Sequence, residues 1–298
     1  MAISDSISDF FSKINPFSSS SVSNVQGDSS FISTNSIISK FAFLILVLIL
    51  FMLALRLGSS FLTWLMTPSN NPVLIPCMMN AKQHKIITQD PAISGSKPIV
   101  RSVNHVEGLE FTWSVWIFVD DFLYKEHEYK HVFHKGNDNI NVSTSPVGMN
   151  YPNNAPGLYI TPDTNALLVV MNTFDKINDE VVVNDLPLNK WVNVMIRVSN
   201  QHQLDIYING TLAKRHILAG IPKQNYGDVY ACMNGGFSGH LSSLRYFSKA
   251  LGTNDIQSIV DNGPSLKLCN SDSDALNSKD TSYLATRWYF SSATDGYN

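Results

Sequence analysis

The sequence predicts an all-β, two-sheet sandwich preceded by one long apolar helix. Short segments with apolar residues at alternate positions recur between about residues 105 and 265, and Gly, Pro and Asn separate them. Many short strands at even spacing are typical of a sandwich. A run without polar side chains occupies residues 41–55, well before the first of these segments. A chain of 298 residues is long enough for one sizeable domain with additions.

Composition divides the chain into five segments. Residues 1–36 are rich in Ser and Asn and are expected to form a flexible tail. Residues 37–66 are predicted to be a membrane anchor, and residues 67–104, with several prolines, an irregular stalk. Residues 105–265 are predicted to form the sandwich, and residues 266–298 an aromatic C-terminal extension.

The apolar run is interpreted as a transmembrane helix. A helix needs ~20 residues to cross ~30 Å of hydrocarbon, and apolar residues continue beyond Arg56 to Met66. Lys40 and Arg56 can reach the interface, and Trp64 suits the interfacial layer. A buried core helix would need partner elements, which the adjacent tail does not offer, and some forty residues before the run argue against a cleaved signal peptide. Because the flanking charges balance, the orientation stays open. The predicted anchor residues are Phe41, Leu44, Leu46, Leu48, Leu50, Leu53, Leu55 and Trp64.

Residues 188–218 carry the clearest strand pattern. Apolar residues alternate with others from Trp191 to Val198, and the alternation resumes from Leu204 to Ile208. Asn209-Gly210 then supplies two residues that tolerate positive φ, as a type I′ turn requires. The sequence therefore predicts two strands and a tight hairpin.

A second segment, residues 109–121, is apolar on both faces. Phe111, Trp113 and Val115 alternate with Thr112 and Ser114, and further apolar residues follow on both sides of the pattern. This suits a central strand of a two-sheet sandwich. Further strands are expected within residues 130–136, 157–162, 166–173, 179–187 and 235–251, and a short helix over 253–260.

The order of these motifs resembles the laminin-G-like, concanavalin-A-like jelly roll over about residues 105–265. In that family a Trp opens the strand before a Tyr-x-Asn-Gly hairpin, and a Gly-Phe-Ser-Gly strand leads to a short helical turn. The resemblance implies structural roles for Trp113, Trp191, Tyr207, Asn209, Gly210, Phe237, Gly239 and Tyr246.

Four further motifs resemble membrane-anchored proteins of large DNA viruses that infect algae and protists: "YKHVFHKGN", "YPNNAPGLYI", "PKQNYGDVY" and "RWYFSSATDGYN". Some of those proteins are virion components beneath the capsid shell. The resemblance implies a minor capsid or virion membrane protein that links an internal membrane to the capsid. Its partners would be the lipid bilayer and capsid proteins, with Trp288, Tyr289 and Phe290 as candidate contacts.

No catalytic residue is predicted. Glucanases of the concanavalin-A-like superfamily need two carboxylates that face one cleft, and no predicted strand carries acids at alternate positions. Glu126 and Glu128 do alternate, but lysines and histidines surround them in what is expected to be a solvated loop. No Gly-x-Ser-x-Gly motif or P-loop occurs, and a net charge of −3 gives no electrostatic argument for nucleic acid.

Neither a metal site nor a cofactor is predicted, although calcium is kept as an alternative. His127, His131 and His134 cluster without a metal-binding spacing, and the cysteines form no zinc motif, which leaves their redox state open. Loop residues that could supply oxygen to calcium are also common in turns. They are Asp120, Asp121, Asn137, Asp138, Asn139 and Asp163.

Two alternatives to the virion hypothesis remain at this point. One is a membrane-tethered, lectin-like adhesion protein, for which Tyr151, Tyr226 and Tyr230 are candidates for stacking on sugars. The other is a degenerate or unrecognised glycan hydrolase. Asn141 and Asn209 both match the N-glycosylation pattern, but the turn already explains Asn209.

Overall fold

The computed structural model describes residues 37–102 and 108–269. The predicted N-terminal tail and the candidate contacts Trp288, Tyr289 and Phe290 lie outside these ranges. The chain divides into two compact units, Met1–Thr67 and Pro68–Asn298, which are described one at a time.

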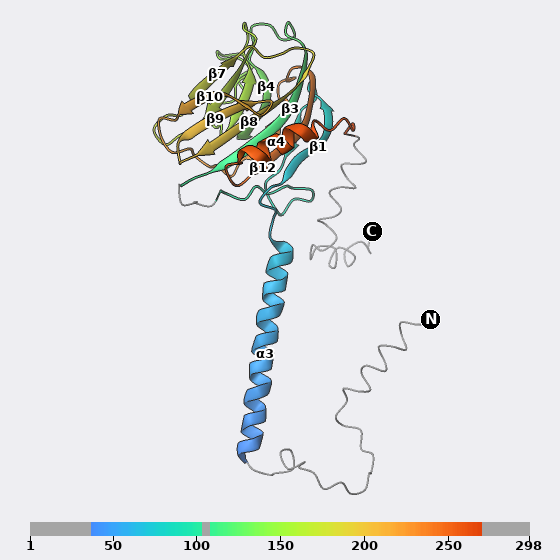
Figure 1. The fold of residues 1–298 in the computed structure, drawn as a ribbon, viewed down its shortest axis with the longest axis vertical. Coiled ribbons are helices and arrows are strands. Elements are labelled where there is room, and N and C mark those ends of the chain that lie inside the picture. The colour runs from blue at the N-terminus through green and yellow to red at the C-terminus, as the bar shows by residue number, and fades with distance from the viewer. Residues whose placement is uncertain (1–36, 103–107, 270–298) are drawn as a thin grey trace, which may run out of the picture. The chain divides into compact units, whose positions relative to one another are not determined.

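The first unit contains a single described element, the helix α3 (Ile37–Met66), which covers the predicted anchor range (Figure 1). Its segment Lys40–Leu65 is long and apolar enough to cross a membrane. Apolar side chains are exposed along that whole segment, and the predicted anchor residues are among them. The hydroxyl groups of Ser59 and Thr63 donate hydrogen bonds to backbone carbonyls within the helix, so these polar groups are satisfied without water.

The second unit is a sandwich of two six-stranded antiparallel sheets, which confirms the predicted fold class. Sheet A has the order β1 (Val73–Asn80), β12 (Ser238–Phe247), β3 (Phe111–Asp121), β8 (Trp191–Ser199), β9 (Gln203–Ile208) and β10 (Thr211–Ile217). Sheet B has the order β2 (Lys85–Ile87), β11 (Asp228–Ala231), β4 (Lys130–Gly136), β5 (Gly157–Ile160), β6 (Ala166–Met171) and β7 (Asp179–Asn184).

The core lies between the sheets and contains the alternating residues that the sequence indicates. Trp113 of β3 is buried and its ring lies 5.4 Å from that of Phe133 of β4, so it bridges the two sheets. On its other side, Tyr246 of β12 packs against Trp113 at 5.1 Å. The outer face of sheet A is partly covered by α4 (Thr253–Asn262), which buries Ile256 against Met195. As predicted, β3 is a central strand, between β12 and β8.

The predicted hairpin is confirmed. Strands β9 and β10 are joined at Asn209 and Gly210, whose φ angles are 48° and 79°. Positive φ at both positions is the type I′ requirement. The side chain of Asn209 also accepts a hydrogen bond from the backbone N–H of Asn193 at 2.8 Å, which ties the turn to β8.

The prediction of an irregular stalk over residues 67–104 is wrong for its first part, because β1 and β2 lie within it. Strand β1 is an edge strand, and its register shifts between Ile75 and Met78, around Pro76. An edge or a bulge is where a strand tolerates proline. Strand β11 was not expected either, and it fills the place in sheet B between β2 and β4.

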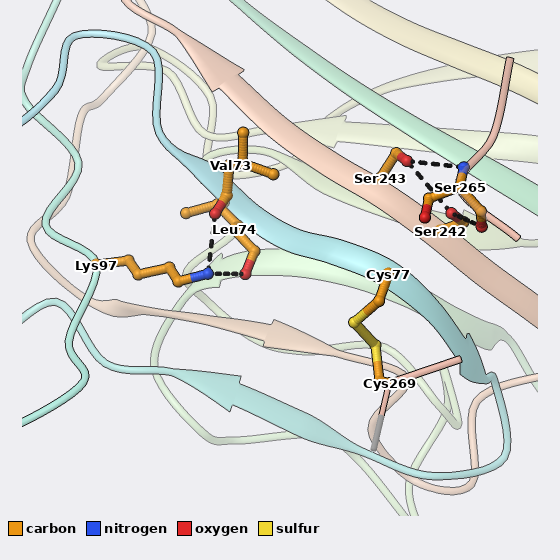
Figure 2. The surroundings of a disulfide bond; sticks show 8 residues. All are labelled: Val73, Leu74, Cys77, Lys97, Ser242, Ser243, Ser265 and Cys269. Atoms are coloured by element: carbon orange, nitrogen blue, oxygen red, sulfur yellow. Dashed lines mark hydrogen bonds between the residues drawn. A yellow bond between two sulfur atoms is a disulfide. The ribbon is translucent and has the colours of Figure 1, made fainter. Parts of the chain in front are cut away.

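A disulfide joins the two ends of the sandwich, so the domain extends past residue 265. Cys77 of β1 is bonded to Cys269, with Cα atoms 5.2 Å apart (Figure 2). The backbones beside it are paired as well, since Met78 donates to Lys267 at 2.7 Å and Cys269 donates to Met78 at 2.9 Å. Ser242 also donates to the carbonyl of Ser265 at 2.7 Å, so the segment after α4 is held on sheet A.

Candidate functional site

The outer face of sheet B is covered by the loop of residues 137–156. Tyr159 and Leu168 alternate with core residues and therefore point away from the sandwich interior. Both are buried, together with Val170, against Met149 of the loop. The outer face of sheet B is therefore packed, and the residues of it that the structure describes form no open cleft.

A chain of hydrogen bonds runs through His131 and His134 under this loop. The backbone N–H of Met233 donates to Nδ1 of His131 at 3.0 Å, so Nε2 of His131 carries the proton. That Nε2 lies 2.6 Å from Nδ1 of His134 and donates to it. Nε2 of His134 in turn donates to the carbonyl of Asn137 at 2.9 Å. The bonding pattern requires both imidazoles to be neutral.

The surroundings keep the pair neutral as well. The ring of His134 stacks on Tyr230 at 4.9 Å, and that of His131 meets the edge of Tyr159 at 5.3 Å. Burial lowers the pKa of His134 to about 4. Burial, followed by the charge of His134, lowers the pKa of His131 well below its usual value. Because every ring nitrogen already has a partner, the pair has no free atom for a metal or for proton abstraction.

The histidine cluster seen in the sequence is divided in the structure. His127 is exposed and its Nδ1 lies 2.7 Å from Asp163, apart from the buried pair. Within residues 37–102 and 108–269, no group of three His, Cys, Asp or Glu side chains could hold a metal ion.

The loop residues considered for calcium mostly make turn or loop contacts. Asp121 accepts from the backbone of Leu123 at 2.9 Å, and Asn137 accepts from the side chain of Asn150 at 3.2 Å. Asn139 donates to the carbonyl of Tyr151 at 2.7 Å. The side chains of Asp121, Asn137 and Asn139 are therefore already engaged in hydrogen bonds within their own loops.

The acidic pair in the sequence does not form a catalytic arrangement. Glu128 accepts from Lys125 at 3.2 Å and from Asn234 at 3.4 Å, whereas Glu126 is exposed in the same loop. Asp205, buried in sheet A, is bound by Arg215 at 2.7 Å and Arg197 at 3.0 Å. Burial raises the pKa of Asp205, but these cationic partners outweigh it and leave the pKa below its usual value. A general acid for glycoside cleavage needs the opposite shift.

An open hollow of about 660 Å³ lies among the loops at one end of the sandwich. Three loops and the segment around Arg101 contribute to it. Its apolar lining includes Phe174, which is 70% exposed, and its described lining residues include no Asp or Glu. The full lining is Arg101, Leu109, Pro152, Asn153, Asn172, Phe174, Ile177, Ile221, Pro222, Lys223, Gln224 and Asn225.

Polar groups in the hollow differ in how far they are already engaged. Oε1 of Gln224 accepts from Ser102 at 3.2 Å, but its buried Nε2 has no partner among the residues that the structure describes. The ammonium of Lys223 lies 5.5 Å from the centre of the Phe174 ring. Asn225, by contrast, donates to Lys135 at 3.0 Å and so serves the fold. The hollow thus offers the aromatic ring of Phe174 and two cationic side chains, Lys223 and Arg101, of which Arg101 already donates to Gln224 at 3.4 Å and to Tyr226 at 3.3 Å.

The family model of the concanavalin A-like lectin/glucanases superfamily matches residues 95–257, more than half of the chain. The chain belongs to this superfamily. The match agrees with the jelly-roll resemblance noted in the sequence. No curated protein matches the chain.

Among solved structures, the ligand-binding domain of botulinum neurotoxin serotype D in complex with N-acetylneuraminic acid is 13% identical, with a TM-score of 0.45. The match covers 65% of this chain and 46% of that one. The receptor-binding domain of the C/D mosaic serotype is 15% identical, with a TM-score of 0.40, and 52% and 36% of the two chains are covered. The chain thus spans less than half the length of these structures, and the likeness concerns the fold alone.

Within this superfamily fold, the motif residues occupy packing positions. Phe237 and Tyr246 are buried in the core, and Trp191 packs on Phe118 at 5.5 Å. Gly239 lies so close to the carbonyl of Phe118 that a side chain would collide with it. Their role as framework residues stays a prediction, with packing in its favour.

The candidate stacking tyrosines are separated. Tyr230 is buried on His134, and Tyr151 is exposed on the loop of residues 137–156. Tyr226 is exposed near the hollow and lies beneath Arg101 at 5.9 Å. Phe174 and Gln224 were not predicted, because loop residues that far apart in sequence show no shared pattern.

Proposed function

We propose that this protein is a membrane-anchored, non-catalytic binding protein whose ligand occupies the hollow beside Phe174. The observation that carries the proposal is the lining of that hollow. It contains an aromatic ring and two cationic side chains, and no Asp or Glu occurs among its described residues. Glycoside cleavage needs two carboxyl groups across the bond. Binding needs only shape, an apolar surface and a few polar groups.

Carbohydrate is the ligand class that the lining suits best. The ring of Phe174 offers an apolar face on which a sugar ring can stack, and the ammonium of Lys223 beside it can donate to a hydroxyl. Arg101 and Lys223 add positive charge without a neighbouring acid in the described lining, which favours an acidic sugar over a neutral one.

The anchor in this proposal is α3. Its segment Lys40–Leu65 exposes apolar side chains along its length, as a single lipid-facing span would. A chain with this helix and a binding sandwich would be a single-pass membrane protein that holds its ligand near a bilayer.

A virion component is the second candidate, and the sequence resemblance to proteins of large DNA viruses favours it. In that case the partner would be a capsid protein, and the sandwich would lie between an internal membrane and the capsid shell. The C-terminal residues Trp288, Tyr289 and Phe290 would then be candidate contacts. The presence of the protein in purified particles would support this second candidate.

A panel of neutral and acidic oligosaccharides, applied to the detergent-solubilised full chain, tests the first candidate. Phe174→Ala and Lys223→Ala are expected to weaken binding about tenfold each, which corresponds to the loss of about one stacking or charged contact. Leu123→Ala is the matched control, because Leu123 is also 70% exposed and is not part of the hollow. Equal binding by all three variants would rule out this hollow as the site, and absence of any binding would favour a protein partner.

A further inference from the structure

The disulfide between Cys77 and Cys269 indicates the type of cellular compartment in which the sandwich folds. Its formation removes two protons and two electrons from the thiols and passes them to a thiol–disulfide exchange partner, which oxidising compartments supply. The bonded residues lie in paired backbone, since Met78 forms a bridge with Leu268. The bond is therefore part of the sandwich, and the domain is expected to fold where disulfides persist.

The order of the helix and the disulfide along the chain predicts on which side of the membrane the sandwich lies. Of the residues that the structure describes, only the helix α3 is long and apolar enough to cross a membrane. Cys77 lies on β1, the first strand after that helix, and Cys269 belongs to the same unit. With this connectivity, a sandwich that folds in an oxidising compartment would lie on the lumenal or extracellular side of the membrane, and the chain before the helix would begin on the cytosolic side. The balanced charges of Lys40 and Arg56 do not oppose this.

An acceptor for N-glycosylation is presented on that side. Asn141, Val142 and Ser143 form the Asn-x-Ser pattern within the loop of residues 137–156. Val142 is 68% exposed and Ser143 is exposed too. The backbone of Asn141 is fixed by hydrogen bonds to Met149 and from Gly148, at 2.9 and 2.7 Å, and Asn141 itself is half-buried.

The other matching sequence is already used by the fold. Asn209 holds the backbone N–H of Asn193 through its side-chain oxygen and sits in the type I′ turn. Gly210, next to it, packs beside Gln257 and Val260 of α4. This asparagine is expected to stay unmodified.

We infer that Asn141 is an N-glycosylation site on a sandwich that faces the oxidising side of its membrane. In the reaction, Nδ2 of Asn141 attacks the anomeric carbon of an oligosaccharide carried on a polyprenyl pyrophosphate. A C–N bond forms, the bond from that carbon to the pyrophosphate oxygen breaks, the lipid pyrophosphate leaves, and the amide loses one proton. The inference is independent of the ligand proposed for the hollow.

Expression of the full chain in eukaryotic cells, followed by N-glycosidase treatment and gel electrophoresis, tests it. The wild type is expected to lose the mass of one glycan. Asn141→Gln and Ser143→Ala are each expected to run at the deglycosylated position, whereas Asn209→Gln is expected to keep the shift. Using two substitutions at separate residues guards against a folding defect in either one.

An orientation reporter completes the experiment. Ala2→Asn introduces an acceptor pattern with Ile3 and Ser4 in the N-terminal segment, and it is expected to add no glycan. A glycan on this reporter and none on Asn141 would reverse the orientation. The proposal would be wrong if the wild-type chain carried no glycan. It would also be wrong if the glycan were lost only in Asn209→Gln.

Discussion

Nε2 of His131 lies 2.6 Å from Nδ1 of His134, and the direction of this bond is fixed from both ends. Met233 can only donate to His131, and the carbonyl of Asn137 can only accept from His134. A proton added to either imidazole would place two N–H groups against each other. The pair therefore keeps its hydrogen bonds to Met233 and to the start of the loop at Asn137 only while both rings are neutral.

The first prediction is that acid destabilises the sandwich between pH 6.5 and about 4. The pKa of His134 falls from 6.5 to about 4 on folding because the ring is buried, so the unfolded chain binds more protons in this range. The stabilisation is complete above pH 6.5 and is lost as the pH falls, by up to about 3 kcal/mol from this residue.

Urea unfolding of the full chain from pH 7.5 to 4.5 measures this effect. His127→Asn removes an exposed imidazole outside the buried pair and is the matched control. The prediction fails if a His131→Asn/His134→Asn double variant loses stability with acid as steeply as the wild type.

The second prediction concerns the hairpin. Gly210 has φ of 79°, so Gly210→Val should destabilise the domain by about 1–3 kcal/mol through backbone strain. Gly252→Ala is the control, because Gly252 has φ of −76° and open space around it. Melting temperatures of the two variants should differ by several degrees, and equal values would contradict the strain.

The third prediction concerns the covalent link between the ends of the domain. Cys77→Ser/Cys269→Ser should reduce the free energy of unfolding by about 2–5 kcal/mol, because the open chain gains conformational freedom when unfolded. The wild type in reducing buffer should behave like the double variant. If neither treatment lowers the melting temperature, the two cysteines are not bonded in the native protein.

The fourth prediction concerns the anchor. Leu46→Arg/Leu50→Arg places two charges within the apolar helix, each costing about 2.5–3.5 kcal/mol on insertion. The variant should appear in the soluble fraction after a carbonate wash, whereas Leu46→Met/Leu50→Met should stay with the membranes. An arginine variant that still sediments with membranes would show that the helix is not the anchor.

Local patterns in the sequence were enough for the parts of the fold that depend on local chemistry. Asn209-Gly210 determines a tight turn by itself, and the alternation through Trp113 marks a central strand whatever its neighbours are. Pro76 concealed β1, since a strand with proline is acceptable only at an edge or a bulge, which the sequence does not reveal.

The positions of His131 and His134 could not be predicted from strand alternation. In a regular strand His131 and His134 would point to opposite faces, because their separation is odd. A register shift between His131 and Phe133, relative to β5, brings both rings to the outer face of sheet B. The hollow is still less predictable, because Phe174 and Gln224 belong to loops that only the completed sandwich brings together.

Binding and cleavage measured on one sample test the central proposal most directly. The full chain in detergent would be incubated with acidic and neutral oligosaccharides, and both ligand retention and release of new reducing ends would be followed. The predicted result is that the oligosaccharide binds and that Phe174→Ala weakens this binding. The amount of reducing ends should not exceed that of a control without the protein. Cleavage that disappears in Glu126→Gln or Glu128→Gln would contradict it and make the protein a hydrolase.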